Sequence, residues 1–326
     1  YCLKGDINKI TAGAIKKGLK SEWSFEILPE TDSTNNYAKE LAISGKRNRT
    51  VVITEKQNGG KGRLGRPFYS PEGNGLYMSV LCRPEINVDC APLITSFTAV
   101  AVAKAIEKLS GQDVNIKWVN DVYMNGKKIC GILTEAGFDF EGGTVDYAVI
   151  GIGINVLGTD FPEELINIAT SIEKETGLKI SRNDLAAEVL NNLENMSCEI
   201  KNKKYLDTYR KKSNVIGKRI KVTYGSQVFY AEALDINENA APLEGAEGSA
   251  GSSGAEGSDV HPIYEVPKPE AAAPGKSGAQ EKAGAAPKEA FTPETIYKMR
   301  RNPYGDSPEN SHLLQAYVTQ ENGRAK

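Results

Sequence analysis

Histidine and cysteine are scarce in this chain of 326 residues, and neither forms a pattern typical of metal binding or nucleophilic catalysis. The five cysteines are spread along the chain: Cys2, Cys82, Cys90, Cys130 and Cys198. Their odd number and the lack of a Cys-x-x-Cys pair argue against a disulfide framework and a structural zinc site, and predict reduced thiols. His261 and His312 lie far downstream of the other polar motifs, which argues against a Ser–His triad.

The chain also lacks a surplus of either charge and long apolar runs. Its 40 Lys and Arg residues and 42 Asp and Glu residues give a net charge of −2, whereas a dedicated nucleic-acid binder usually carries a basic surplus. No apolar run approaches the roughly 20 residues that span a bilayer, and no apolar signal block follows the first residue. We therefore expect a cytoplasmic protein without a membrane span.

Composition divides the chain near residue 240. Ala, Gly, Pro and Ser make up most of residues 241–290. Such a stretch has too little apolar side-chain area to offset the entropy of an ordered chain, so it predicts a flexible or semi-extended linker. Residues 291–326 show modest patterning interrupted by Pro303 and Pro308, and we predict a tail of unknown role there.

The stretch before this linker reads as globular. Helical patterns cover residues 34–44, 92–109, 183–200 and 203–211, with Asp32 or Ser33 as the expected N-cap of the first helix and Asn183 as that of the third. Strand patterns cover residues 50–56, 75–83, 114–118, 128–135 and 146–156. Several of these strands are nearly continuous in apolar residues, which predicts an α/β or α+β domain whose sheet is covered by helices.

A second, smaller module is expected after this domain. Residues 215–236 have the pattern of a short antiparallel pair, the opening of a small barrel. The strand pattern ends near residues 237–239, where the linker composition begins. We therefore predict an incomplete barrel with unpaired strand edges.

The loop after strand 50–56 is the sharpest chemical feature. It reads Asn58-Gly-Gly-Lys-Gly-Arg-Leu-Gly-Arg66. Glycines let backbone N–H groups approach an anion, and the cations add charge and hydrogen-bond donors. Gly62 follows Lys61 where a Walker A loop requires Ser or Thr. The loop alone leaves two interpretations open, a phosphate-binding loop and a solvated basic turn.

Three further motifs each have an ordinary structural explanation. Lys117-Trp-Val-Asn-Asp121 and Lys127-Lys-Ile-Cys-Gly-Ile132 flank an Asn-Gly pair, which predicts a hairpin. Thr31-Asp-Ser-Thr-Asn35 is typical of a helix cap. Gly151-Ile-Gly-Ile-Asn155 is typical of a buried strand with glycines for close packing, and lacks the third glycine of the dinucleotide-binding fingerprint.

In their order and spacing, these motifs and the loop resemble those of biotin protein ligases, which adenylate biotin and attach it to a lysine of a carrier protein. The resemblance covers about residues 21–240 and rests above all on the loop and the hairpin motifs. It implies a mixed central sheet with helices, of the class II synthetase type, over residues 21–213, followed by an SH3-like barrel that is partial here, over residues 214–240. Residues 1–20 are then the residual linker from a winged-helix domain that the chain lacks, and no DNA binding is expected.

The resemblance also implies roles for individual residues. Those implied at biotin are Ser33, Thr34, Asn35, Gln57, Gly60, Lys61, Gly62, Arg63 and Gly131. Those implied at the nucleotide are Arg66, Phe68, Lys117, Asn120 and Asn155. Lys128 and Arg63 are the implied catalytic cations, and Asp121 is the candidate Mg²⁺ ligand. Phe68 replaces a Trp and Val119 a Pro found in family members, but neither change removes a charge.

The activity implied is the formation of biotinoyl-5′-AMP from biotin and ATP with Mg²⁺, then transfer to a lysine of a biotin carboxyl carrier protein. Homodimer formation is left open. Two alternatives also remain. One is a lipoate-type ligase, which uses the same adenylation logic but generally lacks the basic loop pattern. The other is a biotin-binding or fused protein whose catalysis is weakened by the shortened barrel.

Overall fold

The computed structural model describes residues 9–139, 141–158, 160–224, 227–245 and 263–265. The chain forms two compact units. The first comprises Tyr1–Asn214 and Glu238–Ala241, and the second comprises Val215–Asn237 and Pro242–Lys326. The expected tail, most of the expected linker, both histidines and Cys2 lie outside the described residues.

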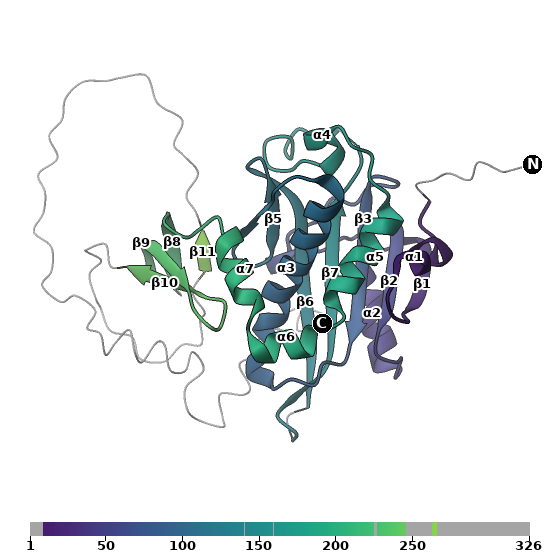
Figure 1. Cartoon of the computed structure of the whole chain (residues 1–326), viewed down its shortest axis with the longest axis horizontal. Helices are drawn as coiled ribbons and strands as arrows, with labels where there is room; N and C mark the ends of the chain where they lie inside the picture. The colour runs from purple at the N-terminus through teal and green to yellow at the C-terminus, as the bar shows by residue number, and fades with distance from the viewer. Residues whose placement is uncertain (1–8, 140, 159, 225–226, 246–262, 266–326) are drawn as a thin grey trace, which may run out of the picture. The chain divides into compact units, whose positions relative to one another are not determined.

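A seven-stranded mixed sheet forms the centre of the first unit (Figure 1). In spatial order its strands are β1 (Ser24–Thr31), β2 (Thr50–Gln57), β3 (Gly75–Cys82), β7 (Thr144–Asn155), β6 (Lys127–Asp139), β5 (Asp121–Met124) and β4 (Asn115–Lys117). β1 pairs with β2 in parallel, and the other neighbouring pairs are antiparallel. The expected mixed sheet with helices is therefore confirmed.

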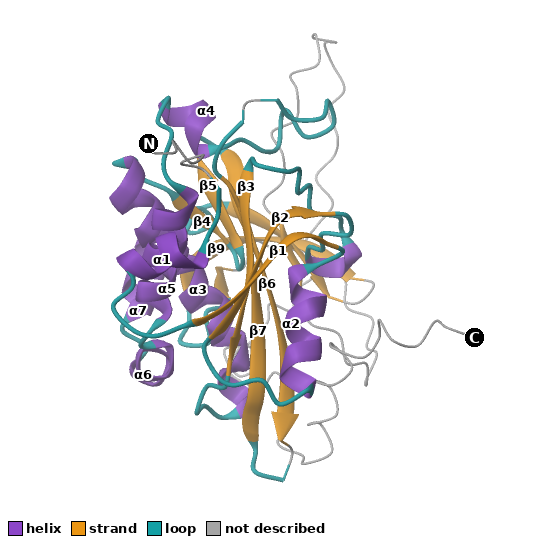
Figure 2. Ribbon diagram, turned by 90° about the vertical axis from the view of Figure 1, so that its right-hand side faces the viewer, coloured by secondary structure: helices purple, strands orange, loops and turns teal. Residues whose placement is uncertain are grey.

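Helices cover both faces of this sheet. Figure 2 shows α2 (Thr34–Ile43) on one face and α1 (Ala12–Gly18), α3 (Ala91–Ser110) and α5 (Arg182–Leu193) on the other. The remaining helical segments are η1 (Arg63–Gly65), η2 (Val88–Cys90), α4 (Ile172–Thr176), α6 (Met196–Asn202) and α7 (Tyr205–Lys212). α6 and α7 both pack on α3.

Small residues bring α2 close to the sheet. Ala38 and Ala42 are buried in a cluster with Val52, Leu81 and Val149, which come from β2, β3 and β7. Because the helix is seated on three strands at once, its N-terminal turn has a fixed position relative to them. That turn carries the Asp-Ser-Thr-Asn motif.

The helix α3 contradicts the prediction that the chain has no apolar segment of membrane-spanning length. Val88–Ser110 is long and apolar enough to cross a membrane, with a mean hydropathy of 1.4, so the expectation that no such segment exists is wrong. Scattered polar residues such as Thr95 and Lys104 interrupt the run of apolar letters without lowering its mean hydropathy far. Of the 18 residues that form its most apolar part, 72% are buried inside the protein, which is typical of a core helix in a globular domain.

Other local predictions also differ from the structure. The sequence does not predict β1, a half-exposed edge strand that contains Pro29, because edge strands tolerate Pro and need little apolar patterning. The helix expected over 183–200 is two helices, with Asn195 as N-cap of the second. The N-cap of α5 is Ser181 and not the expected Asn183. The Ser181 hydroxyl accepts a hydrogen bond from the backbone N–H of Asp184.

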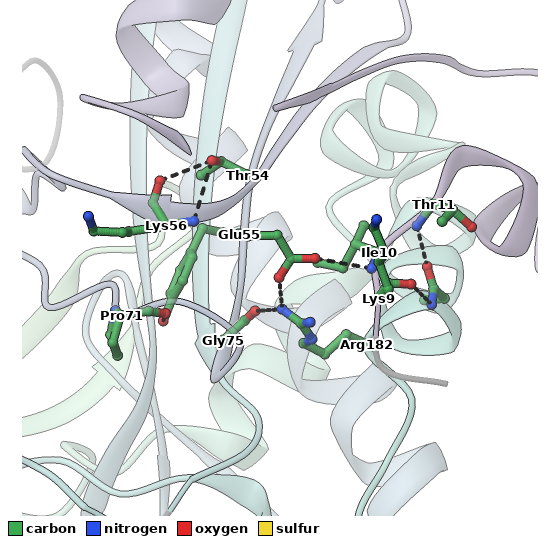
Figure 3. Close-up of polar contacts among 11 residues, drawn as sticks. Lys9, Ile10, Thr11, Thr54, Glu55, Lys56, Pro71, Gly75 and Arg182 are labelled. Carbon is green, nitrogen blue, oxygen red and sulfur yellow. Dashed lines mark hydrogen bonds and ion pairs between the residues drawn. The ribbon is translucent and has the colours of Figure 1, made fainter. Parts of the chain in front are cut away.

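A buried ion pair joins α5 to β2, and its carboxylate also binds the N-terminal segment (Figure 3). Glu55 accepts a hydrogen bond from the N–H of Ile10 at 3.1 Å and pairs with Arg182 at 2.7 Å. Arg182 also donates to the carbonyl of Gly75 at 3.0 Å. The Arg182 side chain is only 3% exposed, so these contacts lie in a weakly screening environment.

Two asparagines of α5 fasten both ends of α1. Asn183 accepts from the N–H of Thr11 and donates to the carbonyl of Lys9. Asn191 makes the equivalent pair of bonds at the other end of α1. The described part of the expected linker over 1–20 is therefore a packed portion of the first unit.

The second unit contains a four-stranded antiparallel sheet. In spatial order its strands are β10 (Pro242–Gly245), β9 (Gln227–Ile236), β8 (Arg219–Tyr224) and β11 (Ile263–Glu265). The prediction that strands end before the linker at 241 is wrong for β10 and β11. These strands are short, at four and three residues, so they depend on backbone pairing with β9 and β8, which composition does not reveal. The SH3-like form stays a prediction.

Replacing Arg182 tests the role of the buried ion pair. Arg182→Met leaves the Glu55 carboxylate without its cation, and we expect the free energy of unfolding to fall by about 3–5 kcal/mol. Lys46→Met, which breaks the more exposed Lys46–Glu26 pair, should cost about 1 kcal/mol or less. Denaturant unfolding measures both, and equal losses would contradict this role of the Glu55–Arg182 pair.

Candidate active site

Glycines on two adjacent strands leave a bare patch of backbone on the sheet. Gly131 of β6 pairs with Gly153 of β7, and the Phe68 ring lies over both. A Cβ added at Gly153 would come within 2.5 Å of the ring, and one at Gly131 within 3.2 Å. A Cβ at Gly151 would clash with the side chain of Asn35. The close packing predicted for the Gly-Ile-Gly-Ile-Asn strand is thus present, and it serves residues from α2 and the glycine-rich loop.

The glycine-rich loop folds back on itself over this patch. Phe68 donates its N–H to the carbonyl of Gly60 at 2.8 Å, and Gly62 donates to the carbonyl of Arg66 at 2.7 Å. The N–H of Gly59 is bound by the carbonyl of Asp32 at 2.8 Å, next to the start of α2. A Cβ at Gly60 would lie 2.5 Å from the Phe68 carbonyl. Gly60 is therefore required for the fold of the loop.

Uncharged polar groups gather where α2 begins. Gln57, at the end of β2, accepts a hydrogen bond from the N–H of Thr34 at 3.0 Å and donates to Ser70 at 2.9 Å. Ser70 in turn donates to the carbonyl of Phe68 at 3.0 Å. Ser33 occupies the N-cap position, and among the described contacts its hydroxyl makes no capping bond. The Ser33 hydroxyl is therefore available to a ligand.

Across the sheet, a cation of the β5–β6 hairpin and a cation of the glycine-rich loop lie near one another's polar partners. Lys128 pairs with Asp121 at 2.8 Å. Arg63 donates to Asn120 Oδ1 at 3.3 Å, and Asn120 donates to the carbonyl of Ile132 at 2.9 Å. The bonds of Asn120 join the glycine-rich loop to the hairpin.

These groups surround a pocket that is open to solvent. The residues implicated by the sequence that line it are Ser33, Thr34, Asn35, Gln57, Lys61, Gly62, Arg63, Phe68, Asn120, Lys128 and Gly131. A second, smaller pocket shares Tyr77 with the first and is lined by Asn155. Since Gln57 lies on β2 and Lys128 on β6, the first pocket runs across the sheet, from the polar groups to the cations.

Four implicated residues line neither pocket. Gly60 holds the loop, and Arg66 is exposed at the loop's end. Lys117 lies with its ammonium 5.7 Å from the centre of the Tyr123 ring. Asp121 pairs with Lys128 behind the pocket wall.

The described residues do not fit a protein-held metal ion. They contain no group of three or more His, Cys, Asp or Glu side chains placed to bind one, and the Asp121 carboxylate is engaged by Lys128. Mg²⁺ is usually bound through one or two carboxylates together with substrate phosphates. A magnesium ion at this site would therefore arrive with a nucleotide as part of the substrate.

Sequence reasoning missed several pocket residues. Tyr77 and Met78 of β3 and Ile132 and Leu133 of β6 line the pocket but read as ordinary core positions in the sequence. Burial raises the pKa of the Tyr77 phenol, and its hydroxyl donates to the carbonyl of Pro71 at 3.1 Å. Ile132 ends the Lys127–Ile132 motif but has no polar group to mark it, and no local motif contains the other three, because the fold brings them to the pocket.

Comparison with known proteins agrees with this geometry. Residues 27–155 match the Biotin/lipoate A/B protein ligase family. The bifunctional ligase/repressor BirA of Bacillus subtilis is 42% identical over 187 residues, 56% of this chain and 57% of that protein. BirA of Salmonella typhimurium is 31% identical over 249 residues, 74% of this chain and 76% of that protein. The biotin protein ligase of Aquifex aeolicus, solved with biotin and ATP, superimposes with a TM-score of 0.59 at 29% identity, covering 68% and 91% of the two chains.

The fold and the site define a member of the Biotin/lipoate A/B ligases. Within that class, the chain belongs to the biotin protein ligase family. It spans 57% of the length of the Bacillus relative.

The environments of the cysteines predict their reactivity. Cys130, next to the pocket residue Gly131, is fully buried, and burial raises the pKa of its thiol, as it raises the pKa of Cys82 to about 12. Because the thiolate is the reactive form, iodoacetamide at pH 7.5 should label the exposed Cys198 and leave Cys130 unlabelled. Peptide mass spectrometry measures this, and rapid labelling of Cys130 in the folded protein would contradict the burial of this strand.

Proposed function

We propose that this chain is an ATP-dependent biotin protein ligase. The observation that carries the proposal is a single pocket with uncharged polar groups at one end and Lys128 and Arg63 at the other, next to a second pocket lined by Asn155. Biotin has the matching polarity, with an uncharged urea ring at one end and a carboxylate at the other. The second pocket is proposed for the nucleotide.

The chemistry requires positive charge at the carboxylate end. A carboxylate is a poor acyl donor, so its oxygen attacks the α-phosphorus of ATP, and pyrophosphate leaves to give biotinoyl-5′-AMP. Two anions approach each other in this step, and fixed cations lower the cost of their meeting. Lys128 and Arg63 are assigned that role, with Mg²⁺ bound to the ATP phosphates. The acceptor lysine then attacks the acyl carbon and AMP leaves.

The other residues are assigned by position. The hydroxyl of Ser33, the hydroxyl of Thr34 and the amide of Gln57 would bind the urea ring, and Gly131, next to Lys128 and Phe68, would contact biotin farther along the pocket. The residues assigned to the side of the nucleotide are Arg66, Phe68, Lys117, Asn120 and Asn155. The glycine-rich loop, including Lys61 and Gly62, would cover the mixed anhydride and slow its hydrolysis.

The polar end favours biotin over the lipoate alternative. Lipoate presents a dithiolane ring, which has no N–H or carbonyl group for Ser33, Thr34 and Gln57 to bind. The acceptor is proposed to be a lysine of a biotin carboxyl carrier protein, and the reaction is proposed to take place in the cytoplasm. The four strands of the second unit lessen the concern that a shortened barrel abolishes activity.

ATP–pyrophosphate exchange tests the proposed function. We expect exchange that depends on biotin and is absent with lipoate or with no acid. Transfer of labelled biotin to a carrier domain then tests the second step. Exchange that depends on lipoate, or none with either acid from folded protein, would overturn the proposal.

Lys128 is the residue whose loss should matter most for the first step. Lys128→Met removes a cation from the reacting anions, so biotin-dependent exchange should fall by roughly 10²–10³-fold. Lys127→Met is the matched control, because the neighbouring lysine donates to the carbonyl of Ile166 at 2.9 Å and does not line the pocket. Equal losses in the two variants would contradict the assignment of Lys128.

A further inference from the structure

A chain of hydrogen bonds runs from a charged side chain that does not line the pocket to a hydroxyl that does. It begins at Glu135 of β6, whose carboxylate pairs with Lys39 at 2.7 Å and accepts from Asn35 Nδ2 at 2.7 Å. It continues through Ser79 of β3 and ends at Thr34. Asn35, Ser79 and Thr34 are buried. The proposed function makes no use of Glu135 or Ser79.

The partners of Asn35 fix which way its amide faces. Its nitrogen lies 2.7 Å from the Glu135 carboxylate and 3.2 Å from the carbonyl of Leu133. Both of these groups only accept hydrogen bonds, so the nitrogen must face them and the oxygen must face Ser79. Turning the amide over would place oxygen against two acceptors. Glu135 therefore fixes the Asn35 amide with its oxygen, a hydrogen-bond acceptor, toward Ser79.

The Ser79 hydroxyl has one hydrogen, and only one of its neighbours requires that hydrogen. Its oxygen lies 2.6 Å from Asn35 Oδ1, which only accepts. The Ser79 hydrogen is therefore committed to Asn35. Toward Thr34, whose hydroxyl oxygen lies 2.7 Å away, Ser79 then offers only a lone pair.

The single hydrogen of the Thr34 hydroxyl is therefore donated to an acceptor within the protein. Its two acceptors are Ser79 at 2.7 Å and Gln57 Oε1 at 3.2 Å. The contact with Gln57 Oε1 is the longer and weaker of the two, and that oxygen also accepts the backbone N–H of Thr34. Thr34 lines the pocket, so a ligand there meets only the lone pairs of this hydroxyl.

We propose that the chain Glu135–Asn35–Ser79 makes Thr34 an obligate hydrogen-bond acceptor and so selects ligands that present an N–H group at that end of the pocket. The inference rests on the proposed function, and it deepens it by naming the basis of substrate choice. Biotin carries N–H groups only on its urea ring, and lipoate carries none. Asn35 is then a positioning residue, because its amide atoms are bound by protein groups.

The test compares two ligands of nearly the same shape. One is biotin, and the other is its cyclic-carbonate analogue, in which ring oxygens replace the urea N–H groups. Calorimetry gives a Kd for each, and the ratio of the analogue's Kd to that of biotin measures selection for the N–H groups. A ring oxygen facing an obligate acceptor is unpaired, so we expect wild-type protein to favour biotin by about 100-fold or more.

Ser79→Ala should lower that ratio by about tenfold, because the Thr34 hydrogen keeps only its longer contact and can turn toward a ring oxygen. A purely structural role for Ser79 would weaken both ligands equally and leave the ratio unchanged. Ser96→Ala is the matched control, since it removes another fully buried serine hydroxyl, bound to Leu93 and Tyr205 in α3 and α7. It should leave the ratio at the wild-type value.

A second pair of variants covers the case in which Ser79→Ala does not fold. Glu135→Ala and Lys39→Met both break the Lys39–Glu135 ion pair, but only Glu135→Ala removes the acceptor that orients Asn35. We expect the ratio to fall in Glu135→Ala and to stay unchanged in Lys39→Met. Thermal unfolding and circular dichroism establish that each variant is folded.

The outcomes separate the two proposals. Wild-type protein that binds biotin, with a ratio unchanged in both Ser79→Ala and Glu135→Ala, overturns the selection by Thr34 and leaves the proposed function standing. Wild-type protein that binds no biotin and shows no biotin-dependent exchange overturns both. A ratio that falls in Ser79→Ala and Glu135→Ala but not in Ser96→Ala or Lys39→Met supports the proposal.

Discussion

The site depends on three positions of the sheet that carry no side chain. Gly131, Gly151 and Gly153 lie on β6 and β7, where any Cβ would meet Phe68, Asn35 or Lys128. Because these positions are bare, the helix α2 and the glycine-rich loop can reach the backbone of the central strands. The pocket is the space that remains between these elements. A single methyl group at Gly151 or Gly153 would displace a residue that shapes the pocket.

The two ends of the pocket differ in charge because different elements line them. At the end near β2, hydroxyl and amide groups are bound to one another, and most of their hydrogens are committed within the protein. At the end near β5, Lys128 and Arg63 are held by Asp121 and Asn120. Side chains already held in place cost little further ordering when a ligand binds. The division suits a molecule with a neutral polar head and an anionic tail.

The sequence predicts those parts of this arrangement that depend on neighbouring residues. The Asn125-Gly126 pair predicts the hairpin, and the glycines of the loop predict that its backbone packs closely against its neighbours. Long-range contacts leave no such trace. Asn35 and Glu135 are 100 residues apart, and Ser79 lies 45 residues from Thr34. Ser79 is one polar residue in an apolar strand, and only the fold shows that it contacts the pocket residues Thr34 and Asn35 of α2.

The same limit explains the errors in the fold. β10 and β11 lie within an Ala- and Gly-rich stretch, and their pairing with β9 and β8 supplies what their composition lacks. The segment around α1 reads as a linker, yet Ile15 is fully buried and side chains of β2 and α5 bind the backbone of this segment. In each case a partner distant in sequence decides the structure.

The most direct test of this account is a crystal structure of the chain with biotin and a non-hydrolysable ATP analogue. The account predicts the urea ring at the polar end of the pocket, beside Ser33 and Gln57, with a ring N–H directed at Thr34 Oγ1. It also predicts the carboxylate within hydrogen-bonding distance of Lys128 or Arg63. Biotin bound with its carboxylate toward Thr34, or outside this pocket, would contradict it.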